Sequence, residues 1–195
     1  MLSEEEKSKI KKILENDGVI SFVTDTVWGL GCLPESKKAV ERIYKIKQRD
    51  TKKPLILMSH DIYPLIKYVD NIPKEAHILI KNYFPGALTL VLNKSNETPD
   101  YITSSMPTVG IRVPDNEVFG DICKSISGHV LATTSANISS EPPALTYEET
   151  EKYIGDKVDY IVKDCGLKAK GRASTVAGIF DNEVKLFRQG DIVLK

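Results

Sequence analysis

Apolar positions along this chain follow two different periods. Residues 4–16 place apolar side chains three or four positions apart, which predicts an amphipathic helix. Ser3 and Glu6 form a capping-box pattern where this helix would begin. A second helix is predicted after Ser36, a residue type that commonly caps helices. The same apolar spacing predicts helices over residues 61–68, 73–83, 118–126 and 147–154.

Short β-branched and apolar runs between these segments predict strands. Val19–Val23 is the first of them, and Val130–Ala132 runs directly into a hydroxyl-rich segment. The other predicted strands are residues 54–58, 87–92, 108–113, 160–162, 174–180 and 184–187. We expect the last two to form a hairpin across Asp181 and Asn182.

The order of these segments predicts a mixed α/β (α+β) fold. Helices and strands follow one another without strict alternation, which is typical of a mixed sheet with covering helices. We expect a single domain over residues 1–195. Residues 24–31 are expected to form a polar, turn-like segment. Residues 93–106 are polar and weakly patterned, which favours a flexible loop.

Charge and composition exclude several classes of protein. The 27 basic residues are balanced by 27 acidic ones, which argues against a surface that coats nucleic acid. No apolar run approaches the roughly 20 residues that a membrane span needs, and the first residues are a charged amphipathic segment unlike a signal peptide. The three cysteines are far apart and odd in number, so neither a disulfide framework nor a zinc site is indicated. We therefore expect a cytoplasmic protein.

The segment Lys45–Pro54 departs from this neutral balance, because it holds five basic residues against the single acid Asp50. It lies between a predicted helix and a predicted buried strand. Cations at the junction of two rigid elements are well placed to hold a phosphate or a carboxylate. Taken alone, however, such a run is most often a solvated loop. The rest of the sequence must decide between these interpretations.

Hydroxyl-bearing or cationic side chains stand at the ends of several predicted strands. Residues 24–26 follow the first strand, Arg112 lies near the end of a later one, residues 133–137 follow another, and Arg188 follows the last. Strand ends of an α/β sheet can converge on one crevice, where ligands commonly bind. A lining of hydroxyl and guanidinium groups suits an anionic ligand with many oxygen atoms.

Several common catalytic signatures are absent from the sequence. It holds neither a GxxxxGK[ST] phosphate loop nor a GxGxxG dinucleotide turn. His60, His77 and His129 lack the spacing of metal ligands. No pair of carboxylates stands out as an acid/base dyad, and Asp25 is only a weak candidate. Chemistry by positioning and electrostatics, as in attack on phosphorus, fits this inventory better than covalent catalysis.

Eight short motifs are spread along the chain. They are residues 24–31, 47–49, 53–55, 84–86 together with Thr89, 112–114, 135–137, 174–176 and 188–190. In this order they resemble the YrdC/TsaC family, the threonylcarbamoyl-AMP synthases. The most specific part is the pair Lys47-x-Arg49 and Ser135-x-Asn137 combined with the segment TDTVWGLG. The resemblance covers about residues 10–193, and the chain looks like the short, single-domain form.

This resemblance implies a twisted open sheet with a concave, positively charged, YrdC-like cavity. It implies a reaction that joins L-threonine, bicarbonate and ATP to give L-threonylcarbamoyl-AMP and pyrophosphate, with Mg²⁺ arriving together with ATP. Partner proteins would pass the threonylcarbamoyl group to the adenosine beside the anticodon of certain tRNAs. Any contact of this chain with RNA would be weak.

The resemblance also carries the family's site residues over to matching positions. Those expected to contact L-threonine are Thr26, Met58, Arg112, Thr133 and Ser174. Those expected to contact ATP are Arg49, Lys53, Thr108, Ser135, Asn137, Pro143 and Arg188. Lys47 and Arg49 are expected to be catalytic, stabilising charge on the phosphoryl oxygens and the leaving group. No metal site built by the protein itself is expected.

Some positions depart from the family's pattern. Met58 stands where a His is usual, so a threonine contact from it would be apolar or through the main chain. Lys53 replaces a common Asn, and Asn116 a common His. Ser140 and Pro143 replace a Gly and a small polar residue in a later loop. These departures bear on substrate preference and turnover more than on the fold.

Two other functions remain open from the sequence. One is a domain that handles a carbamoyl adenylate, as in hydrogenase-maturation carbamoyltransferases, although the zinc-finger and acylphosphatase-like parts of those proteins are absent from this sequence. The other is a non-catalytic RNA-binding or ribosome-assembly factor that uses the basic concavity. The neutral net charge weighs against strong RNA binding by the chain alone.

Overall fold

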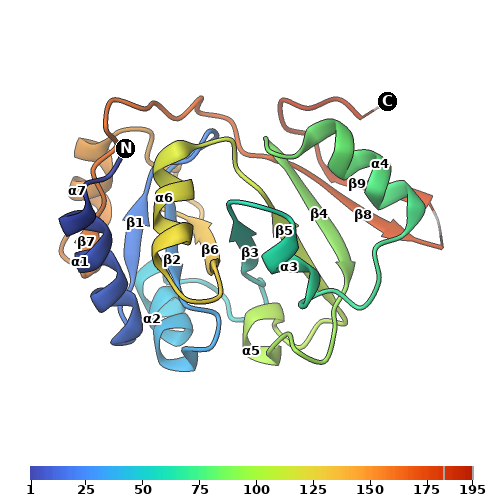
Figure 1. Ribbon diagram of the computed structural model, residues 1–195, viewed down its shortest axis with the longest axis horizontal. Helices are drawn as coiled ribbons and strands as arrows, with labels where there is room; N and C mark the ends of the chain where they lie inside the picture. Colours follow the sequence, from blue (N-terminus) through green and yellow to red (C-terminus); the bar gives the residue numbers. More distant parts are fainter. Residues whose placement is uncertain (182, 195) are drawn as a thin grey trace.

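The computed structural model of the chain describes residues 1–181 and 183–194 (Figure 1). The strands in these residues are β1 (Ile20–Phe22), β2 (Gly29–Cys32), β3 (Ile56–Ser59), β4 (Leu88–Asn93), β5 (Thr108–Arg112), β6 (Val130–Ser135), β7 (Tyr160–Ile161), β8 (Thr175–Phe180) and β9 (Glu183–Arg188). The helices are α1 (Glu4–Glu15), α2 (Lys37–Lys47), α3 (Tyr63–Ile66), α4 (Lys74–Tyr83), α5 (Asp100–Thr103), α6 (Glu117–Ser125) and α7 (Tyr147–Ile154).

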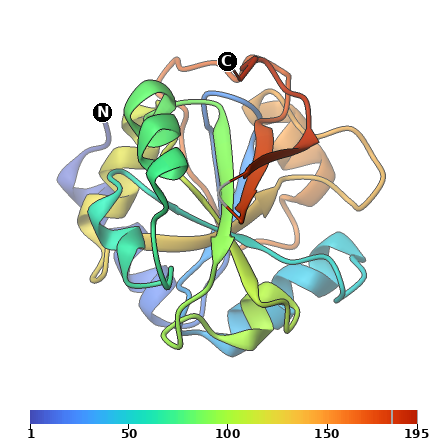
Figure 2. The same cartoon turned by 90° about the vertical axis from the view of Figure 1, so that its right-hand side faces the viewer.

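The strands form one mixed sheet in the order β7-β1-β2-β6-β3-β5-β4-β8-β9. Three neighbouring pairs are parallel, namely β1 with β7, β3 with β5, and β4 with β8. The remaining pairs are antiparallel. The predicted mixed α/β sheet is therefore confirmed, and Figure 2 shows how strongly its strands twist across the molecule.

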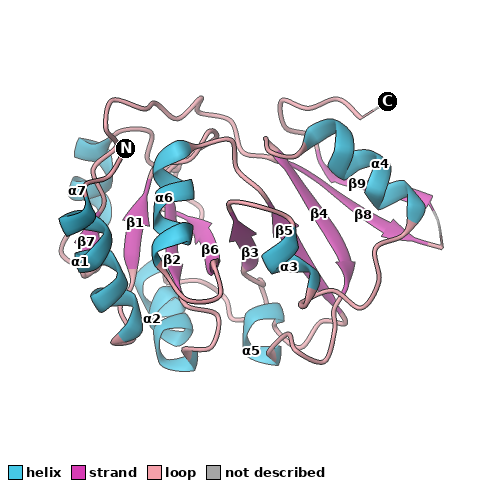
Figure 3. Ribbon diagram, viewed as in Figure 1, coloured by secondary structure: helices cyan, strands magenta, loops and turns pink. Residues whose placement is uncertain are grey.

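Helices pack on the sheet where the sequence gives them an apolar side. In Figure 3, α1, α6, α3 and α4 lie in front of the sheet, whereas α2 and α5 lie toward its lower edge. The ring of Phe22 in β1 packs on that of Phe119 in α6, with centroids 5.1 Å apart. Both side chains are fully buried, so this contact ties the helix layer to the sheet. None of the described helices is both long and apolar enough to span a membrane.

Capping residues explain where the predicted helices begin. Ser3 forms the expected capping box, in which its hydroxyl accepts a hydrogen bond from the Glu6 amide at 3.2 Å and the Glu6 carboxylate accepts from the Ser3 amide at 3.3 Å. Ser36 caps α2 by accepting from the Ala39 amide at 3.1 Å. Asn116, at the position where a His is usual in the resembled family, caps α6 by accepting from the Phe119 amide at 2.9 Å.

Two polar segments are more ordered than their sequences predict. Residues 29–31 were expected to form a turn, but they belong to β2, which pairs with β1 and β6. Glycines carry no side chain that could reveal a strand's period, and a Cβ at Gly29 or Gly31 would lie within 2.9 Å of the Phe22 ring. Residues 93–106, expected to be a flexible loop, include the end of β4 and the helical turn α5.

Other boundaries shift by a few residues. Lys45 and Lys47 lie in the last turn of α2 instead of after it, and β6 extends through Ser135. Helix α2 ends at Lys47 and is capped by Gln48, whose φ of 48° is left-handed. The hairpin of β8 and β9 is confirmed by their antiparallel pairing, while its predicted turn residue Asn182 lies outside the described residues.

Candidate active site

A cavity of about 330 Å³ lies where strand ends converge. Its lining comes from β1, β2, β3, β5, β6 and β9 and from segments next to them. The polar part of this lining consists of three guanidinium groups and six hydroxyl groups, from Arg49, Arg112, Arg188, Thr24, Thr26, Thr133, Thr134, Ser135 and Ser174. No Asp or Glu is among the described residues that line it. The predicted convergence of strand ends that carry hydroxyl and guanidinium groups is thus present in the structure.

A second cavity of about 350 Å³ adjoins the first and shares Pro54, Ile56, Ser174 and Arg188 with it. The rest of its lining is largely apolar and includes Val91, Met106, Val176, Phe180 and Phe187, with the hydroxyls of Thr89 and Thr108. Gly110 also lines it, and a Cβ there would meet Ile56 at 2.8 Å. We call the first the polar cavity and the second the apolar cavity, and the two lie side by side.

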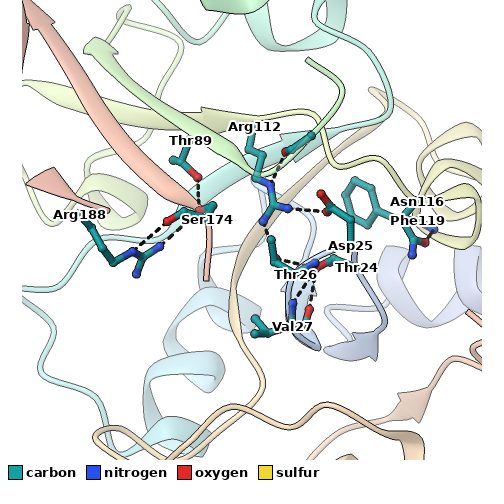
Figure 4. A network of polar contacts seen from close by, with 11 residues as sticks. Thr24, Asp25, Thr26, Val27, Thr89, Arg112, Asn116, Phe119, Ser174 and Arg188 are labelled. Carbon is teal, nitrogen blue, oxygen red and sulfur yellow. Dashed lines mark hydrogen bonds and ion pairs between the residues drawn. The ribbon is translucent and has the colours of Figure 1, made fainter. Parts of the chain in front are cut away.

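Arg112 forms one wall of the polar cavity and is almost fully buried. Figure 4 shows its polar contacts. Its Nε donates to the Gly86 carbonyl at 3.0 Å and its Nη1 to the Thr26 hydroxyl at 2.8 Å. Its Nη2 donates to the Asp25 carboxylate, forming a buried ion pair. Burial lowers the pKa of Arg112, whereas Asp25 acts in the opposite direction. The guanidinium is therefore fixed from three sides.

Asp25 and Thr26 reach Arg112 from a turn that directly follows β1. The Thr24 hydroxyl stabilises this turn by donating to the Val27 carbonyl at 2.6 Å and by accepting from the Thr26 and Val27 amides. From outside, the Gly171 amide donates to the Thr26 carbonyl at 2.8 Å. The turn is thus held by its own side chain and by a second loop, which gives Asp25 and Thr26 fixed positions.

Ser174 and Arg188 connect the two cavities on the β8–β9 side. The Ser174 hydroxyl lies 2.8 Å from that of Thr89 in β4. Arg188 donates from Nε to the Ser174 carbonyl at 3.0 Å and from Nη2 to the Ser174 hydroxyl at 3.3 Å (Figure 4). Because both residues line both cavities, a ligand that spans the cavities would pass beside this bonded pair.

Lys47 lies behind the opposite wall with only 1% of its surface exposed. Its Nζ donates to the Ser135 carbonyl at 2.6 Å, the Asn137 carbonyl at 2.7 Å and the Asn137 side-chain oxygen at 2.8 Å. Its own carbonyl accepts from the Ser139 amide at 2.8 Å. Burial and then the neighbouring Arg49 lower the pKa of Lys47 to about 7. Its three donors are all used within the protein.

Arg49 lines the polar cavity between α2 and β3. Its Nε donates to the Lys53 carbonyl at 3.2 Å, its Nη2 to the Pro54 carbonyl at 2.9 Å and its Nη1 to the Thr134 hydroxyl at 3.0 Å. Burial lowers its pKa. Since all these acceptors are neutral, Arg49 brings an uncompensated positive charge to the cavity wall.

The structure brings most of the predicted site residues together. All five residues predicted to contact threonine line the polar cavity, and so do four of those predicted to contact ATP, Arg49, Ser135, Pro143 and Arg188. Thr108 lines the apolar cavity. Lys47, Lys53 and Asn137 are in neither lining. Direct substrate contacts from these last three residues stay predictions.

Sequence reasoning missed several cavity residues. Thr134 holds Arg49, yet only its neighbours Thr133 and Ser135 in β6 were predicted to contact a substrate. Ile56 lies two positions before Met58, so the strand period could have placed both on the same face. Phe22 and Ala173 are apolar, and nothing in their sequence context distinguishes them from core residues. Trp28 lies within the motif TDTVWGLG, but no substrate contact was predicted for it.

A family model for the Sua5/YciO/YrdC domain, described as "Telomere recombination", matches residues 12–190. The threonylcarbamoyl-AMP synthase of Idiomarina loihiensis is 34% identical over 149 residues, which are 75% of this chain and 80% of that protein. The chain belongs to the Sua5/YciO/YrdC family. The predicted resemblance is therefore confirmed.

Solved structures of Sua5 and YciO share this fold. Sua5 of P. abyssi, crystallised with L-threonine, superposes with a TM-score of 0.87 at 32% identity, over 94% of this chain and 54% of that protein. The chain thus spans about half the length of that Sua5. E. coli YciO superposes with a TM-score of 0.85 at 28% identity, over 96% of this chain and 89% of YciO. The cavities described above lie within this shared Sua5/YciO/YrdC fold.

Proposed function

We propose that this chain is an L-threonylcarbamoyl-AMP synthase. The observation that carries the proposal is that all five residues predicted to contact threonine line one cavity, although they come from five separate segments. Membership of the Sua5/YciO/YrdC family supports it, since relatives that cover most of this chain bear that name. The P. abyssi Sua5 complex adds that a relative of the same fold binds L-threonine.

The proposed reaction has two balanced steps. The neutral amine of threonine attacks bicarbonate, releasing water and giving a carbamate. A carbamate oxygen then attacks the α-phosphorus of ATP, the bond from that phosphorus to the bridging oxygen breaks, and pyrophosphate leaves. Neither step needs a protein nucleophile, so the enzyme acts by holding the reactants and stabilising the developing charge.

The two cavities suggest how the substrates divide between them. The threonine carboxylate would meet Arg112, and its side chain would lie among the hydroxyl and methyl groups of Thr26, Thr133 and Met58. The nucleoside would occupy the apolar cavity beside Thr108, where an aromatic base can pack on apolar side chains. The phosphates would then cross between the cavities near Ser174 and Arg188.

Arg49 and Arg188 supply positive charge where the phosphates would lie. We assign to Arg49 the stabilisation of charge on the α-phosphate and the departing pyrophosphate. Lys47 and Asn137 would contribute by fixing the end of β6 that carries Ser135, because their polar groups bond within the protein. The Lys53 carbonyl supports Arg49, and its exposed ammonium is proposed to meet the outer phosphates.

Mg²⁺ is proposed to enter bound to the triphosphate. The described residues that line the polar cavity offer hydroxyl and guanidinium groups, which do not form the oxygen-anion ligand set that this ion prefers. Asp25, the carboxylate beside the cavity, is bonded to Arg112. The ion would therefore be held by phosphate oxygens.

We place the product in tRNA modification in the cytoplasm. Threonylcarbamoyl-AMP is a reactive mixed anhydride, so partner proteins would have to transfer its threonylcarbamoyl group promptly to the adenosine beside the anticodon. Contact of this chain with tRNA is proposed to be weak, because its formal net charge is zero.

The test is pyrophosphate release from ATP and bicarbonate, measured with and without L-threonine. We expect release to require threonine. Turnover that ignores threonine would favour a carbamoyl-adenylate activity instead. RNA binding that persists in Arg49→Ala, with neither turnover nor nucleotide binding in the unchanged chain, would favour a non-catalytic RNA-binding factor.

A further inference from the structure

Asp25 is a buried carboxylate that the proposed reaction does not use directly. Its side chain is 6% exposed and accepts a hydrogen bond from Nη2 of Arg112. Its neighbours Thr24 and Thr26 line the polar cavity, whereas Asp25 does not. Figure 4 shows its carboxylate turned toward the Arg112 guanidinium. Asp25 can therefore act on a bound ligand only through its neighbours.

The hydrogen bonds of Arg112 leave a defined set of donors for a ligand. A guanidinium has five N–H groups, and three of these are taken by Gly86, Thr26 and Asp25. One N–H remains on each terminal nitrogen, and Arg112 lines the cavity. Two N–H groups on one rigid plane match the two oxygens of a carboxylate.

Asp25 also sets the net charge of this wall. Without a carboxylate partner, a guanidinium that is 4% exposed would be a buried, uncompensated cation. With Asp25 bonded to it, the pair is neutral and still offers two donors. Such a wall suits the carboxylate of an amino acid that is neutral overall, whereas a net positive wall would attract multiply charged anions.

We propose that Asp25 is a positioning residue that makes this wall selective for the carboxylate of a neutral amino acid. This inference rests on the proposed function. Asp25 holds Arg112 in one orientation and, by cancelling its charge, disfavours binding of polyanions such as inorganic phosphate in the threonine position. It thereby helps to keep the phosphates of ATP on the Arg49 and Arg188 side.

The test is Asp25→Asn, which keeps the shape of the side chain and removes its charge. Pyrophosphate release is measured while threonine and ATP are varied separately, and inorganic phosphate is added as the probe anion. We expect the threonine KM to rise about 10- to 100-fold, because one charged hydrogen bond is lost and Arg112 is released. The ATP KM should change less than about twofold, and phosphate should inhibit more strongly than in the unchanged chain.

Two further variants separate positioning from folding. Asp159→Asn weakens another Arg–Asp pair, with Arg42, whose residues do not line either cavity. It should lower the melting temperature and leave the threonine KM unchanged. Asp25→Glu keeps the charge but moves the carboxylate, so it should raise the threonine KM without stronger phosphate inhibition. If Asp25→Asn does not fold, the threonine KM of Asp25→Glu decides whether Asp25 is a positioning residue.

The results that would contradict the role of Asp25 differ from those that would contradict the proposed synthase function. If the unchanged chain is active and both folded Asp25 variants keep its threonine KM, Asp25 is not a positioning residue. Equal rises in the threonine and ATP KM values would also contradict the inference, since they would indicate general disorder. If the unchanged chain releases no pyrophosphate in response to threonine, the proposed function itself fails.

Discussion

Two cations are buried beside the same cavity, and the protein treats them differently. Arg112 is bonded to a carboxylate, Asp25, as well as to a carbonyl and a hydroxyl. Lys47 is bonded to three neutral oxygens of Ser135 and Asn137. Its neighbour Arg49 also has neutral acceptors alone. One wall is therefore close to neutral, and the other carries a net positive charge.

This difference indicates how one cavity can accept two unlike substrates. A neutral wall with spare donors suits a zwitterion, and a positive wall suits phosphates. Net charge, rather than the number of cationic residues, then decides which ligand binds where. Variants that alter one wall at a time test whether the two walls differ in this way.

The largest expected effect is on stability, in Arg112→Gln. This change leaves the Asp25 carboxylate buried without its cation, which should lower the free energy of unfolding by about 3–5 kcal/mol. Chemical denaturation measures it. Adding Asp25→Asn should recover much of the stability but not threonine binding. A double variant as unstable as the single one would show that charge pairing is not what this wall requires.

Lys47→Met should cost less stability, about 1–3 kcal/mol, because it leaves unpaired neutral oxygens and no buried charge. It should nevertheless abolish most synthesis, since the end of β6 that carries Ser135 loses its anchor. Denaturation and pyrophosphate release measure the two effects. Lys45→Met, an exposed site in the same turn, is the control and should change neither. Synthesis at a normal rate in Lys47→Met would refute the anchoring role.

Arg49→Gln tests the positive wall from within the cavity. Synthesis should slow sharply, because Arg49 is assigned to stabilising the developing charge, and the ATP KM should rise about tenfold, because one cation proposed to face the phosphates is lost. The threonine KM should stay nearly constant, which is the reverse of the pattern expected for Asp25→Asn. Steady-state kinetics with each substrate varied in turn measures the two KM values. A rise in the threonine KM alone would mean that the two walls have been assigned to the wrong ligands.

The buried ammonium should also make stability depend on pH. The pKa of Lys47 is lowered to about 7 by burial and by Arg49, whereas an unfolded lysine titrates near 10.4. Between these values the unfolded chain binds more protons, so stability should rise with pH by at most about 1.4 kcal/mol per unit. Below about pH 7 both states hold the proton, and the cost of burying the charge is fully present.

Comparison of the unchanged chain with Lys47→Met isolates this effect. The difference in their free energies of unfolding should grow between about pH 6 and about pH 9, in favour of the unchanged chain. Urea denaturation at each pH measures it. A difference that stays flat across this range would mean that Lys47 keeps its proton when buried.

The smallest expected effect concerns the loop that Lys47 anchors. Ser140 has a φ of 74°, which favours glycine, so Ser140→Gly should stabilise the chain by about 0.5–1 kcal/mol. Thermal denaturation would show it as a rise of a few degrees. Ser104 also has a left-handed φ, of 54°, but its hydroxyl donates to the Thr51 carbonyl. Ser104→Gly should therefore gain less, and an equal gain would point to a cause other than the backbone.

The sequence predicted the fold best where side chains reveal a period. Helix α7 has the predicted bounds, and the capping box of α1 is present. Strand β2 could not be recognised, because two of its four residues are glycines. Glycine is needed there because the Phe22 ring leaves no room for a Cβ. Residues 93–106 were expected to be flexible, yet the Ile102 carbonyl accepts from the Leu55 amide at 2.9 Å. Contacts between distant segments leave no local pattern.

The candidate site followed the same rule. The motifs correctly predicted that Thr26, Arg112 and Ser174 lie together, because motif positions mark residues that a shared fold brings to one place. They could not tell a lining residue from one behind it, as Lys47 illustrates. Its charge suggested a phosphate contact, whereas burial and three internal acceptors favour a structural role. The charge balance of each wall depends on such partners, which only the folded chain defines.

The proposed synthesis is tested most directly by following labelled carbon from bicarbonate into the product. The chain would be incubated with ATP, L-threonine and isotopically labelled bicarbonate, and the nucleotides would be analysed by mass spectrometry. The account predicts labelled L-threonylcarbamoyl-AMP in amounts equal to the pyrophosphate released, and none when any one substrate is omitted. Pyrophosphate formed without threonine, or a folded chain that makes no labelled adenylate, would contradict it.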